Sequence, residues 1–409
     1  MHKIERLLHT LAPKGVEFRK LGEVINIFKG KQLNKELLLD YGEYPVMNGG
    51  IHASGYWNEY NTDYPKIIIS QGGASAGYVN YMTSKFWAGA HCYAIELNSE
   101  KLNYKFLYYF LKNSQTILMK SQFGAGIPAL NKADIETLTI PIPPLEIQQE
   151  IVKILDAFTE LNTELNTELN ARKKQYQYYQ NMLLDFNDIN QNHQDAKEKL
   201  AQKPYPKRLK TLLHTLAPKG VGFRKLGEVL EYDQPNQYCV TSKDFDESYP
   251  TPVLTAGKTF ILGYTNEKDN IYQASKSSPV IIFDDFTTAT QWVDFPFKVK
   301  SSAMKILLPK NPIINIRFIF FYMQTIPYNI GGEHARHWIS RYSQLEVPIP
   351  PLEIQQEIVK ILDQFSLLTT DLLAGIPAEI KARKKQYEYY REKLLTFKPL
   401  TPNKEVDKA

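Results

Sequence analysis

The sequence has little of what membrane, secreted or fibrous proteins need. Its 409 residues include only two cysteines, Cys92 and Cys239, which cannot make a disulfide framework, so a reduced cytoplasmic setting is expected. The longest apolar stretches, such as Ile314–Tyr322, fall well short of the roughly 20 residues that cross a bilayer. Met1–Arg6 leads into no apolar segment, so no secretory signal is expected.

What remains is an ordinary globular composition with a mild basic excess. Hydrophobic residues make up 43% of the chain and charged residues 23%, which excludes wholesale disorder. The formal net charge of +5 permits nucleic acid binding without requiring it. Composition therefore leaves the function open.

Internal repeats decide the architecture. Seventeen of eighteen positions agree between Leu7–Val24 and Leu212–Val229, at an offset of 205. Pro141–Asp156 returns without change as Pro348–Asp363, and Ala171–Leu184 returns in closely similar form as Ala382–Leu395. A period this long is a duplicated domain with its connector rather than a solenoid unit.

Between the repeated blocks the two halves diverge but keep a faint common skeleton. Short β-rich runs alternate with loops rich in Gly, Asn and Tyr, and each region closes with an apolar helix-like run, Leu102–Leu111 or Ile314–Met323. We expect an α+β fold used twice with different surface residues. The polar stretch 187–208 is predicted to link the halves.

The connectors are predicted to be long helices. Apolar residues recur at spacings of four and three, and no Gly or Pro occurs from Leu145 to Phe186, which predicts one helix of about 40 residues. Gly375 and Pro377 are expected to kink or break the second helix. The expected coil and partner-facing positions are Ile147, Ile151, Ile154, Phe158, Tyr176 and Tyr179, with Ile354, Ile358, Ile361, Phe365, Tyr387 and Tyr390. Pairing of the two helices is favoured, and packing of each along its own domain is the alternative.

None of the catalytic or cofactor-binding motifs that the sequence imitates is complete. Gly124–Ala129 imitates a dinucleotide-binding loop, but Pro128 and the lack of a clear preceding strand argue against one. His334 and His337 are too few for a zinc site, and Glu379 with Lys381 fits a charged helix face better than a nuclease. No catalytic residue, metal site or cofactor is expected in this chain.

Loops that mix basic and polar residues indicate DNA binding. Lys and Arg suit phosphates, whereas Asn, Gln, Arg, Ser and Thr suit base edges. The candidates in the first variable region are Lys29, Lys31, Asn34, Lys35, Gln71, Ser75, Tyr78, Asn131 and Lys132. Those in the second are Lys258, Thr259, Thr287, Thr288, Gln291, Lys300, His334, Arg336, His337 and Arg341. Each stretch by itself is most often only a turn.

The duplicated Pro141–Asp156 block, followed by a helix ending in Ala-Arg-Lys-Lys-Gln-Tyr, resembles the specificity (S) subunit of type I restriction-modification systems. The resemblance implies two target recognition domains, each reading half of a split, asymmetric site in double-stranded DNA. It implies two helices in an antiparallel coiled coil that sets the gap and docks two methyltransferase (M) subunits. S-adenosylmethionine, ATP and Mg²⁺ would serve partner subunits, which include the translocating restriction (R) subunits.

On this interpretation the first recognition domain spans 1–140 and its helix 141–186, followed by the linker 187–208. The second recognition domain spans 209–347, its helix 348–397, kinked near Gly375 and Pro377, and the tail 398–409. A coiled-coil scaffold that binds proteins is the alternative function, and a lone nuclease or methyltransferase is a further one. Thr159–Asn170 repeats Thr-Glu-Leu-Asn three times, which suggests an adjustable ruler.

Overall fold

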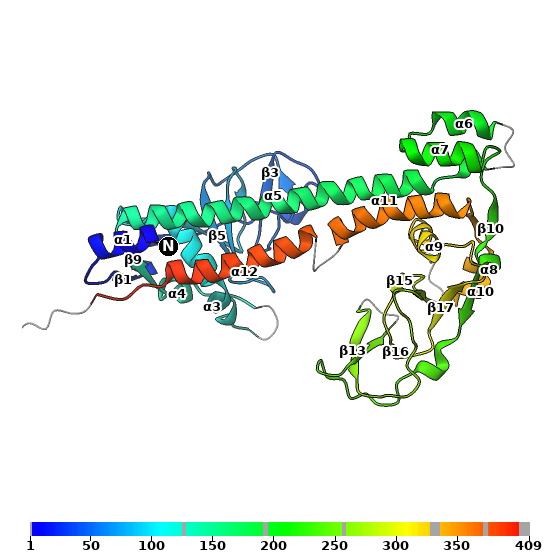
Figure 1. The fold of residues 1–409 in the computed structure, drawn as a ribbon. Coiled ribbons are helices and arrows are strands. Elements are labelled where there is room, and N and C mark those ends of the chain that lie inside the picture. The colour runs from blue at the N-terminus through cyan, green and yellow to red at the C-terminus, as the bar shows by residue number, and fades with distance from the viewer. Residues whose placement is uncertain are drawn as a thin grey trace, which may run out of the picture. The chain divides into compact units, whose positions relative to one another are not determined.

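The computed structural model describes residues 2–124, 128–190, 195–255, 259–327, 336–370 and 375–400. The chain divides into two compact units, the first made of residues 1–166 and 379–409 and the second of residues 167–378. Each unit combines one α+β domain with segments of the long helices (Figure 1). No helix among the described residues is both long and apolar enough to cross a membrane.

The first α+β domain, from α1 to β9, is built on a four-stranded sheet in the order β2-β8-β5-β6. A three-stranded sheet, β4-β3-β7, and the ladder β1-β9 complete it. Its strands are β1 (Glu17–Lys20), β2 (Ile25–Lys29), β3 (Tyr44–Met47), β4 (Tyr56–Trp57), β5 (Lys66–Ser70), β6 (Val79–Met82), β7 (Trp87–Ala88), β8 (Cys92–Leu97) and β9 (Thr139–Ile142). Its helices are α1 (His2–Leu11), α2 (Tyr104–Asn113), α3 (Gln115–Lys120) and α4 (Lys132–Glu136).

The second α+β domain, from α7 to β18, repeats this topology. Its sheets have the orders β11-β17-β14-β15, β13-β12-β16 and β10-β18. The strands are β10 (Phe223–Lys225), β11 (Leu230–Asp233), β12 (Thr251–Leu254), β13 (Ile261–Thr265), β14 (Val280–Asp284), β15 (Thr290–Val293), β16 (Lys298–Val299), β17 (Met304–Pro309) and β18 (Glu346–Pro348). The helices are α7 (Lys207–Leu216), α8 (Leu226–Val229), α9 (Ile316–Met323) and α10 (His337–Ser340). The expectation of one α+β fold used twice is confirmed.

Both faces of each four-stranded sheet are covered, which explains its continuous apolar strands. In β5, Ile67 and Ile69 belong to the core shared with the helices, whereas Ile68 belongs to a smaller core with residues of β3 and β7. In β14, Ile281 and Phe283 face one core and neighbouring residues the other. Successive side chains of a strand point to opposite faces, so a strand buried on both sides needs no polar alternation.

The long helices follow the sequence prediction closely. α5 runs for 40 residues, Leu145–Leu184, and contributes its first part to the first unit and its last part to the second. The second connector consists of two helices, α11 (Leu352–Thr370) and α12 (Ile376–Leu395), so it is interrupted next to Gly375 and Pro377 as expected. Residues 371–374 lie outside the described residues.

In the first unit α5 and α12 pack side by side and antiparallel (Figure 1). Phe158 stacks on Tyr390, with ring centroids 5.6 Å apart, and lies 6.3 Å from Tyr387. Leu394, later in α12, shares a core with Ile147, earlier in α5. Higher residue numbers on one helix thus meet lower numbers on the other.

In the second unit the last part of α5 packs on α11 in the same way. Tyr179 stacks on Phe365 with ring centroids 5.0 Å apart. Leu183 shares a core with Ile354 and Ile358. Tyr176 and Ile361 are half-buried against that core. Tyr179 and Tyr390, which occupy the same place in the repeated blocks, therefore both lie at helix contacts.

Packing of each helix along its own domain, the alternative to helix pairing, also occurs. Ile147 and Ile151 are fully buried in the domain core together with Leu155, which the predicted seam omitted. Ile154 and Phe158 are only half-buried and lie on the side facing α12. The helix buries two faces at once, one toward the domain and one toward the paired helix.

The segment expected to be a polar linker, 187–208, is more than a tether. It contains the 3-10 helix η3 (Asn187–Ile189) and α6 (Ala196–Gln202), and it leads directly into α7. Ile189, Leu200 and Tyr205 are buried in the core of the second unit. Lys203 pairs with Asp185 at 2.9 Å. A few apolar residues suffice to dock the segment although its composition is polar.

Candidate nucleic-acid interface

Three loops of the first domain meet at one edge of its sheets. Ser75, in the loop after β5, donates its hydroxyl to the carbonyl oxygen of Gly49 at 2.7 Å. The side-chain oxygen of Asn48 accepts the backbone N–H of His91, just before β8, at 3.2 Å. The N–H of Gln71 donates to the carbonyl of His91 at 2.9 Å. These bonds fix the loop backbones and leave the His91 side chain exposed.

A fourth segment joins this edge, and the second domain repeats the connection. The N–H of Leu130 donates to the carbonyl of Gln71 at 2.8 Å, and that of Gly73 donates to Pro128 at 2.8 Å. In the second domain the N–H of His337 donates to the carbonyl of Asp285 at 2.9 Å. Each domain thus ties the loop after a central strand to the segment where a short helix begins.

Not every predicted residue at this edge is free to contact DNA. The ring of Tyr78 lies 4.0 Å from the ammonium of Lys112, which also donates to the carbonyl of Val79 and to Gln115, each at 2.8 Å. Burial, reinforced by nearby Arg391, lowers the pKa of Lys112 to about 8. This arrangement gives Tyr78 a packing role within the protein.

Asn131 and Lys132 take part in the start of α4. Asn131 forms a capping box with Asp134, in which each side chain accepts a backbone N–H from the other residue. Lys132 pairs with Glu136 at 3.3 Å, one helical turn away. Both side chains remain exposed, although Asn131 takes part in the capping box and Lys132 in an ion pair.

Four further candidates lie at the end of β2 or just after it. Lys29 and Lys31 are exposed and line a cavity of about 310 Å³. Asn34 and Lys35 are exposed at the start of a short 3-10 helix, Lys35–Leu37. These residues carry positive charge to the surface of the first domain.

In the second domain, Asp284 organises the turn after β14. Its carboxylate accepts the N–H groups of Phe286 at 2.9 Å and Thr287 at 3.1 Å, and also the Thr287 hydroxyl. Thr288 has a φ of 59° and is buried, so it shapes the turn. Gln291 is exposed on β15. Thr287 is also exposed, but its hydroxyl is bonded to Asp284, so Gln291 is better placed to contact a ligand.

The loop–helix junction of the second domain rests on a buried charge pair. The Asp285 carboxylate accepts the N–H of Trp338 at 2.8 Å and lies 3.6 Å from the Lys305 ammonium. Both charged side chains are almost completely buried. The pair fixes the segment that holds buried His337 between exposed Arg336 and Arg341.

The remaining candidates are scattered. Thr259 is exposed, and Lys300 is half-buried with its ammonium 5.5 Å from the ring centre of Phe245. Lys258 and His334 lie outside the described residues. Within the described residues no three His, Cys, Asp or Glu side chains gather as a metal site would require.

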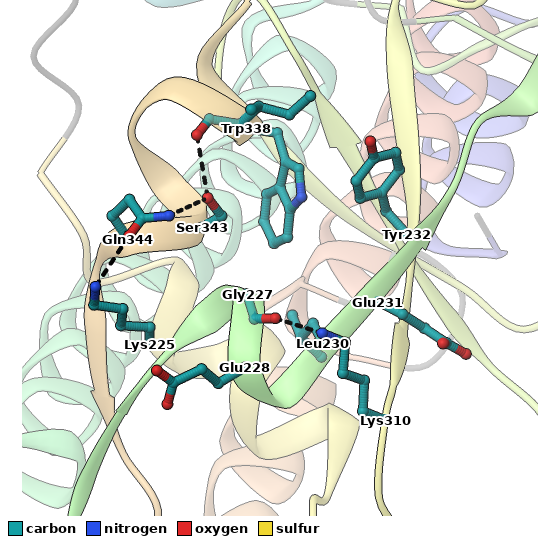
Figure 2. A pocket seen from close by; sticks show the side chains of 11 residues that line it. Lys225, Gly227, Glu228, Leu230, Glu231, Tyr232, Lys310, Trp338, Ser343 and Gln344 are labelled. Carbon is teal, nitrogen blue, oxygen red and sulfur yellow. Dashed lines mark hydrogen bonds between the residues drawn. The ribbon is translucent and has the colours of Figure 1, made fainter.

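A pocket of about 660 Å³ lies in the second unit between β11 and α10, next to the candidates His337 and Arg341. Its lysines are already engaged, because Lys310 donates to the carbonyl of Gly227 at 2.6 Å and Lys225 to Gln344 at 3.1 Å (Figure 2). None of the predicted DNA-binding residues lines it.

Sequence reasoning missed the residue that holds each domain on its helix. The fully buried side chain of Gln148 donates to the carbonyls of Lys101 at 2.8 Å and Pro143 at 2.6 Å. Gln355 donates in the same way to Ile313 at 3.0 Å and Pro350 at 2.7 Å. The signal was present, because both glutamines stand in the block repeated without change.

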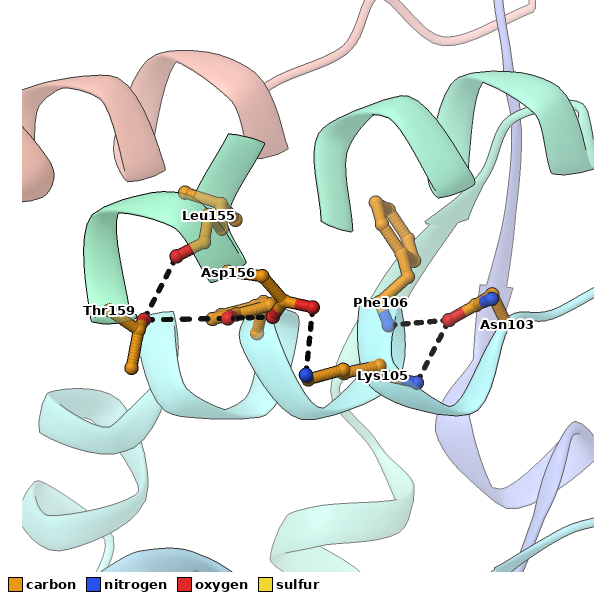
Figure 3. A network of polar contacts seen from close by, with 7 residues as sticks. Asn103, Lys105, Phe106, Leu155, Asp156 and Thr159 are labelled. Carbon is orange, nitrogen blue, oxygen red and sulfur yellow. Dashed lines mark hydrogen bonds and ion pairs between the residues drawn. The ribbon is translucent and has the colours of Figure 1, made fainter. Parts of the chain in front are cut away.

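A second polar contact lies eight residues, or about two turns, further along each helix. Asp156 pairs with Lys105 at 2.7 Å and accepts the hydroxyl of Tyr109 (Figure 3). Burial and this hydrogen bond raise the pKa of Tyr109. In the second unit the corresponding Asp363 forms an ion pair with Arg317 at 2.8 Å. Each α+β domain is therefore fixed to its long helix at several points, and this holds its candidate DNA-binding loops in place.

Comparison with known proteins identifies the repeated unit. The family model described as the type I restriction modification DNA specificity domain matches residues 13–175 and again residues 218–382. The two matches cover both domains and most of both connectors.

Individual relatives agree with the family match. A putative type I restriction enzyme specificity subunit of Haemophilus influenzae is 31% identical over 400 residues, covering 93% of this chain and 96% of that protein. The EcoR124I/EcoR124II type I restriction enzyme specificity subunit of Escherichia coli is 54% identical over 183 residues, which span 42% of this chain and 44% of that subunit.

A solved structure shares the fold. The crystal structure of a type I restriction-modification S subunit from M. genitalium superposes with a TM-score of 0.64 at 20% identity, covering 93% of this chain and 96% of that one. The pair of α+β domains joined to long helices is thus an architecture already seen in an S subunit.

Proposed function

Since the chain belongs to the type I restriction-modification DNA specificity family, we propose that each of its two recognition domains reads one half of a split, asymmetric site in duplex DNA. The chain is the specificity subunit of a type I restriction enzyme and is not catalytic by itself. The methyl transfer and cleavage reactions then belong to partner subunits.

One observation carries this proposal: the two domains fix their loops by the same backbone contacts but expose different side chains there. The link from Gln71 to Leu130 corresponds to the link from Asp285 to His337. Around this common scaffold the first domain presents His91 and the second presents Arg336 and Arg341. Base edges are read by the donors and acceptors of side chains, so different residues on one scaffold suit two different half-sites.

A repeated surface supports the docking of two identical partners. Tyr178 and Tyr389 occupy the same place in the repeated blocks, and each is 59% exposed. Lys174 and Lys385 lie one turn earlier and are also exposed. We assign these two patches to two methyltransferase subunits. S-adenosylmethionine would bind to those subunits, and ATP and Mg²⁺ to the restriction subunits that complete the complex.

The decisive experiment is single-molecule methylation sequencing of a host genome with and without this gene, in the presence of its partner genes. We expect one bipartite motif with N6-methyladenine in both halves to depend on the gene. Exchanging the first domain for that of another S subunit should change one half of the motif only.

A purified chain that shows no salt-dependent, sequence-selective binding to duplex DNA would favour the protein-binding scaffold instead. Methylation or cleavage by the chain alone, with S-adenosylmethionine and Mg²⁺, would contradict the assignment of chemistry to the partners.

A further inference from the structure

The cavity at the end of β2 has the features of a site for DNA phosphate. We propose that the side chains of Lys29 and Lys31 hold a backbone phosphate of the duplex there, and that they contribute affinity and register but no sequence preference. This assignment rests on the proposed function and specifies what one part of the first recognition domain binds.

The two lysines stand on a rigid backbone. The N–H of Gly30 donates to the carbonyl of Cys92 at 2.9 Å, and that of Lys31 donates to Ala88 at 2.8 Å. A Cβ on Gly30 would lie 2.2 Å from the carbonyl oxygen of Gly89, so only glycine allows this close approach. Gly89 also packs against Asn48. The segment that carries Lys29 and Lys31 is therefore next to the loop of Asn48, one of the loops that meet in the candidate DNA interface.

The charges around the cavity leave these two lysines available. The carboxylates that line it already have partners, Glu96 with Lys66 at 3.0 Å and Asp63 with Lys85 at 3.7 Å. Among the described residues Lys29 and Lys31 have no ion pair. Two ammonium groups beside neutralised carboxylates make a local excess of positive charge, which suits a phosphate.

The neutral polar groups of the cavity explain why a base is not the ligand. Asn61 donates to the carbonyl of Ala88 at 3.0 Å and accepts its N–H at 2.7 Å. The hydroxyl of Thr62 donates to Asn61 at 2.9 Å. Base reading requires free donors and acceptors in a fixed pattern, whereas ammonium groups on long flexible stems act as point charges.

Where the structure describes the second domain, the positions that match Lys29 and Lys31 do not form such a site. At the repeat offset of 205, Gln234 corresponds to Lys29 and Asn236 to Lys31. Gln234 is committed internally, since it donates to Ser302 at 2.8 Å and accepts from the buried Lys305. The phosphate contact is therefore asymmetric and belongs to the first half-site.

The test compares the full-length chain with a Lys29→Gln/Lys31→Gln variant on two probes. One is a duplex containing the motif found by methylation sequencing, and the other is an unrelated duplex of equal length. A Lys14→Gln/Lys20→Gln variant, which removes two exposed lysines of the same unit, controls for net charge. Affinity is measured between roughly 50 and 200 mM salt.

We expect the Lys29/Lys31 variant to bind both probes more weakly and to lose about 0.9 from the slope of log affinity against log salt, since the two lysines hold one phosphate and each neutralised phosphate contributes roughly 0.9. Over that salt range its loss of affinity should be about three- to fourfold smaller than that of the wild type. The control should keep the wild-type slope, and the methylated motif should not change.

A slope equal to that of the control would overturn the phosphate assignment, and so would an altered first half of the methylated motif. Failure of the wild-type chain to prefer the motif duplex would instead refute the proposed function itself. The two failures are thus distinguishable in one set of titrations.

Discussion

Asn103 and Gln148 are joined by a hydrogen bond of 2.7 Å, from the backbone N–H of the first to the side-chain oxygen of the second. The same bond recurs between Asn315 and Gln355 at 2.8 Å. In both units the asparagine then caps the helix that packs on the connector, as Figure 3 shows for Asn103. One glutamine therefore fixes the turn, the cap and the long helix together.

Replacing Gln148 by Ala should destabilise the first unit by about 3 kcal/mol, because it leaves two carbonyls and one N–H buried without partners. The neighbouring exposed Gln149→Ala is the matched control and should have almost no effect. The measurement is the shift of the thermal unfolding transition. Equal shifts for the two variants would show that the buried amide is dispensable.

Breaking the buried pair between Asp285 and Lys305 should cost about 3–5 kcal/mol of stability in the second unit, since a lone charge would stay buried. Lys305→Met is the informative variant, and Lys305→Met with Asp285→Asn should recover much of the loss. Denaturant unfolding of the second unit measures both. If the double variant were no more stable than Lys305→Met, charge burial would not be the cause.

Lys112 should make stability depend on pH in the alkaline range. Burial and Arg391 lower its pKa from 10.5 to about 8 in the folded chain, so the unfolded chain binds more protons between these values. Its contribution to stability therefore rises as pH increases from about 8 toward 10.

The pH dependence is best measured as a difference between variants, because tyrosines also titrate above pH 9. The melting-temperature difference between wild type and Lys112→Met should favour the wild type more at higher pH. Exposed Lys120→Met should show no such trend. A difference that stays constant with pH would contradict the lowered pKa.

The sequence predicted the long helices well because their evidence is local. Uninterrupted apolar spacing predicted α5, and Gly375 with Pro377 predicted the interruption of the second helix. The burial of Leu155 was missed because a single seam describes only one face of a helix that packs on two sides.

The arrangement of the candidate DNA-binding loops depends on contacts between residues far apart in the sequence, which no local sequence pattern predicts. Gly49 meets Ser75 and Gln71 meets His91 only after the sheets have formed. Candidates chosen by residue type therefore mixed accessible side chains such as Lys31 with groups already in use, such as Asn131. The unsuspected role of Gln148 has the same origin.

Deleting one of the three Thr-Glu-Leu-Asn units in 159–170 should shorten the gap between the half-sites by about one or two base pairs. Four residues contribute roughly 6 Å of helix and about 40° of rotation beyond a full turn, and one base pair advances the duplex by about 3.4 Å. Methylation sequencing of the deletion strain reads the gap directly. The length-preserving Glu164→Gln should leave it unchanged, and altered half-sites in the deletion strain would sink the ruler hypothesis.

Replacing either Tyr178 or Tyr389 should reduce the number of methyltransferase subunits that the chain binds from two to one. Both rings are exposed, and each packs edge-on against the neighbouring tyrosine of its helix, so truncation to Ala should spare the fold. Exposed aromatic residues are frequent anchors of interfaces and can lose more than 2 kcal/mol on truncation. Titration with purified methyltransferase subunit, read by light scattering, should show two bound subunits for the wild type, one for each single variant and none for the double. The neighbours Gln177→Ala and Glu388→Ala serve as controls; if they matched the tyrosine variants, or if the double variant still bound two subunits, the partner surface would lie elsewhere.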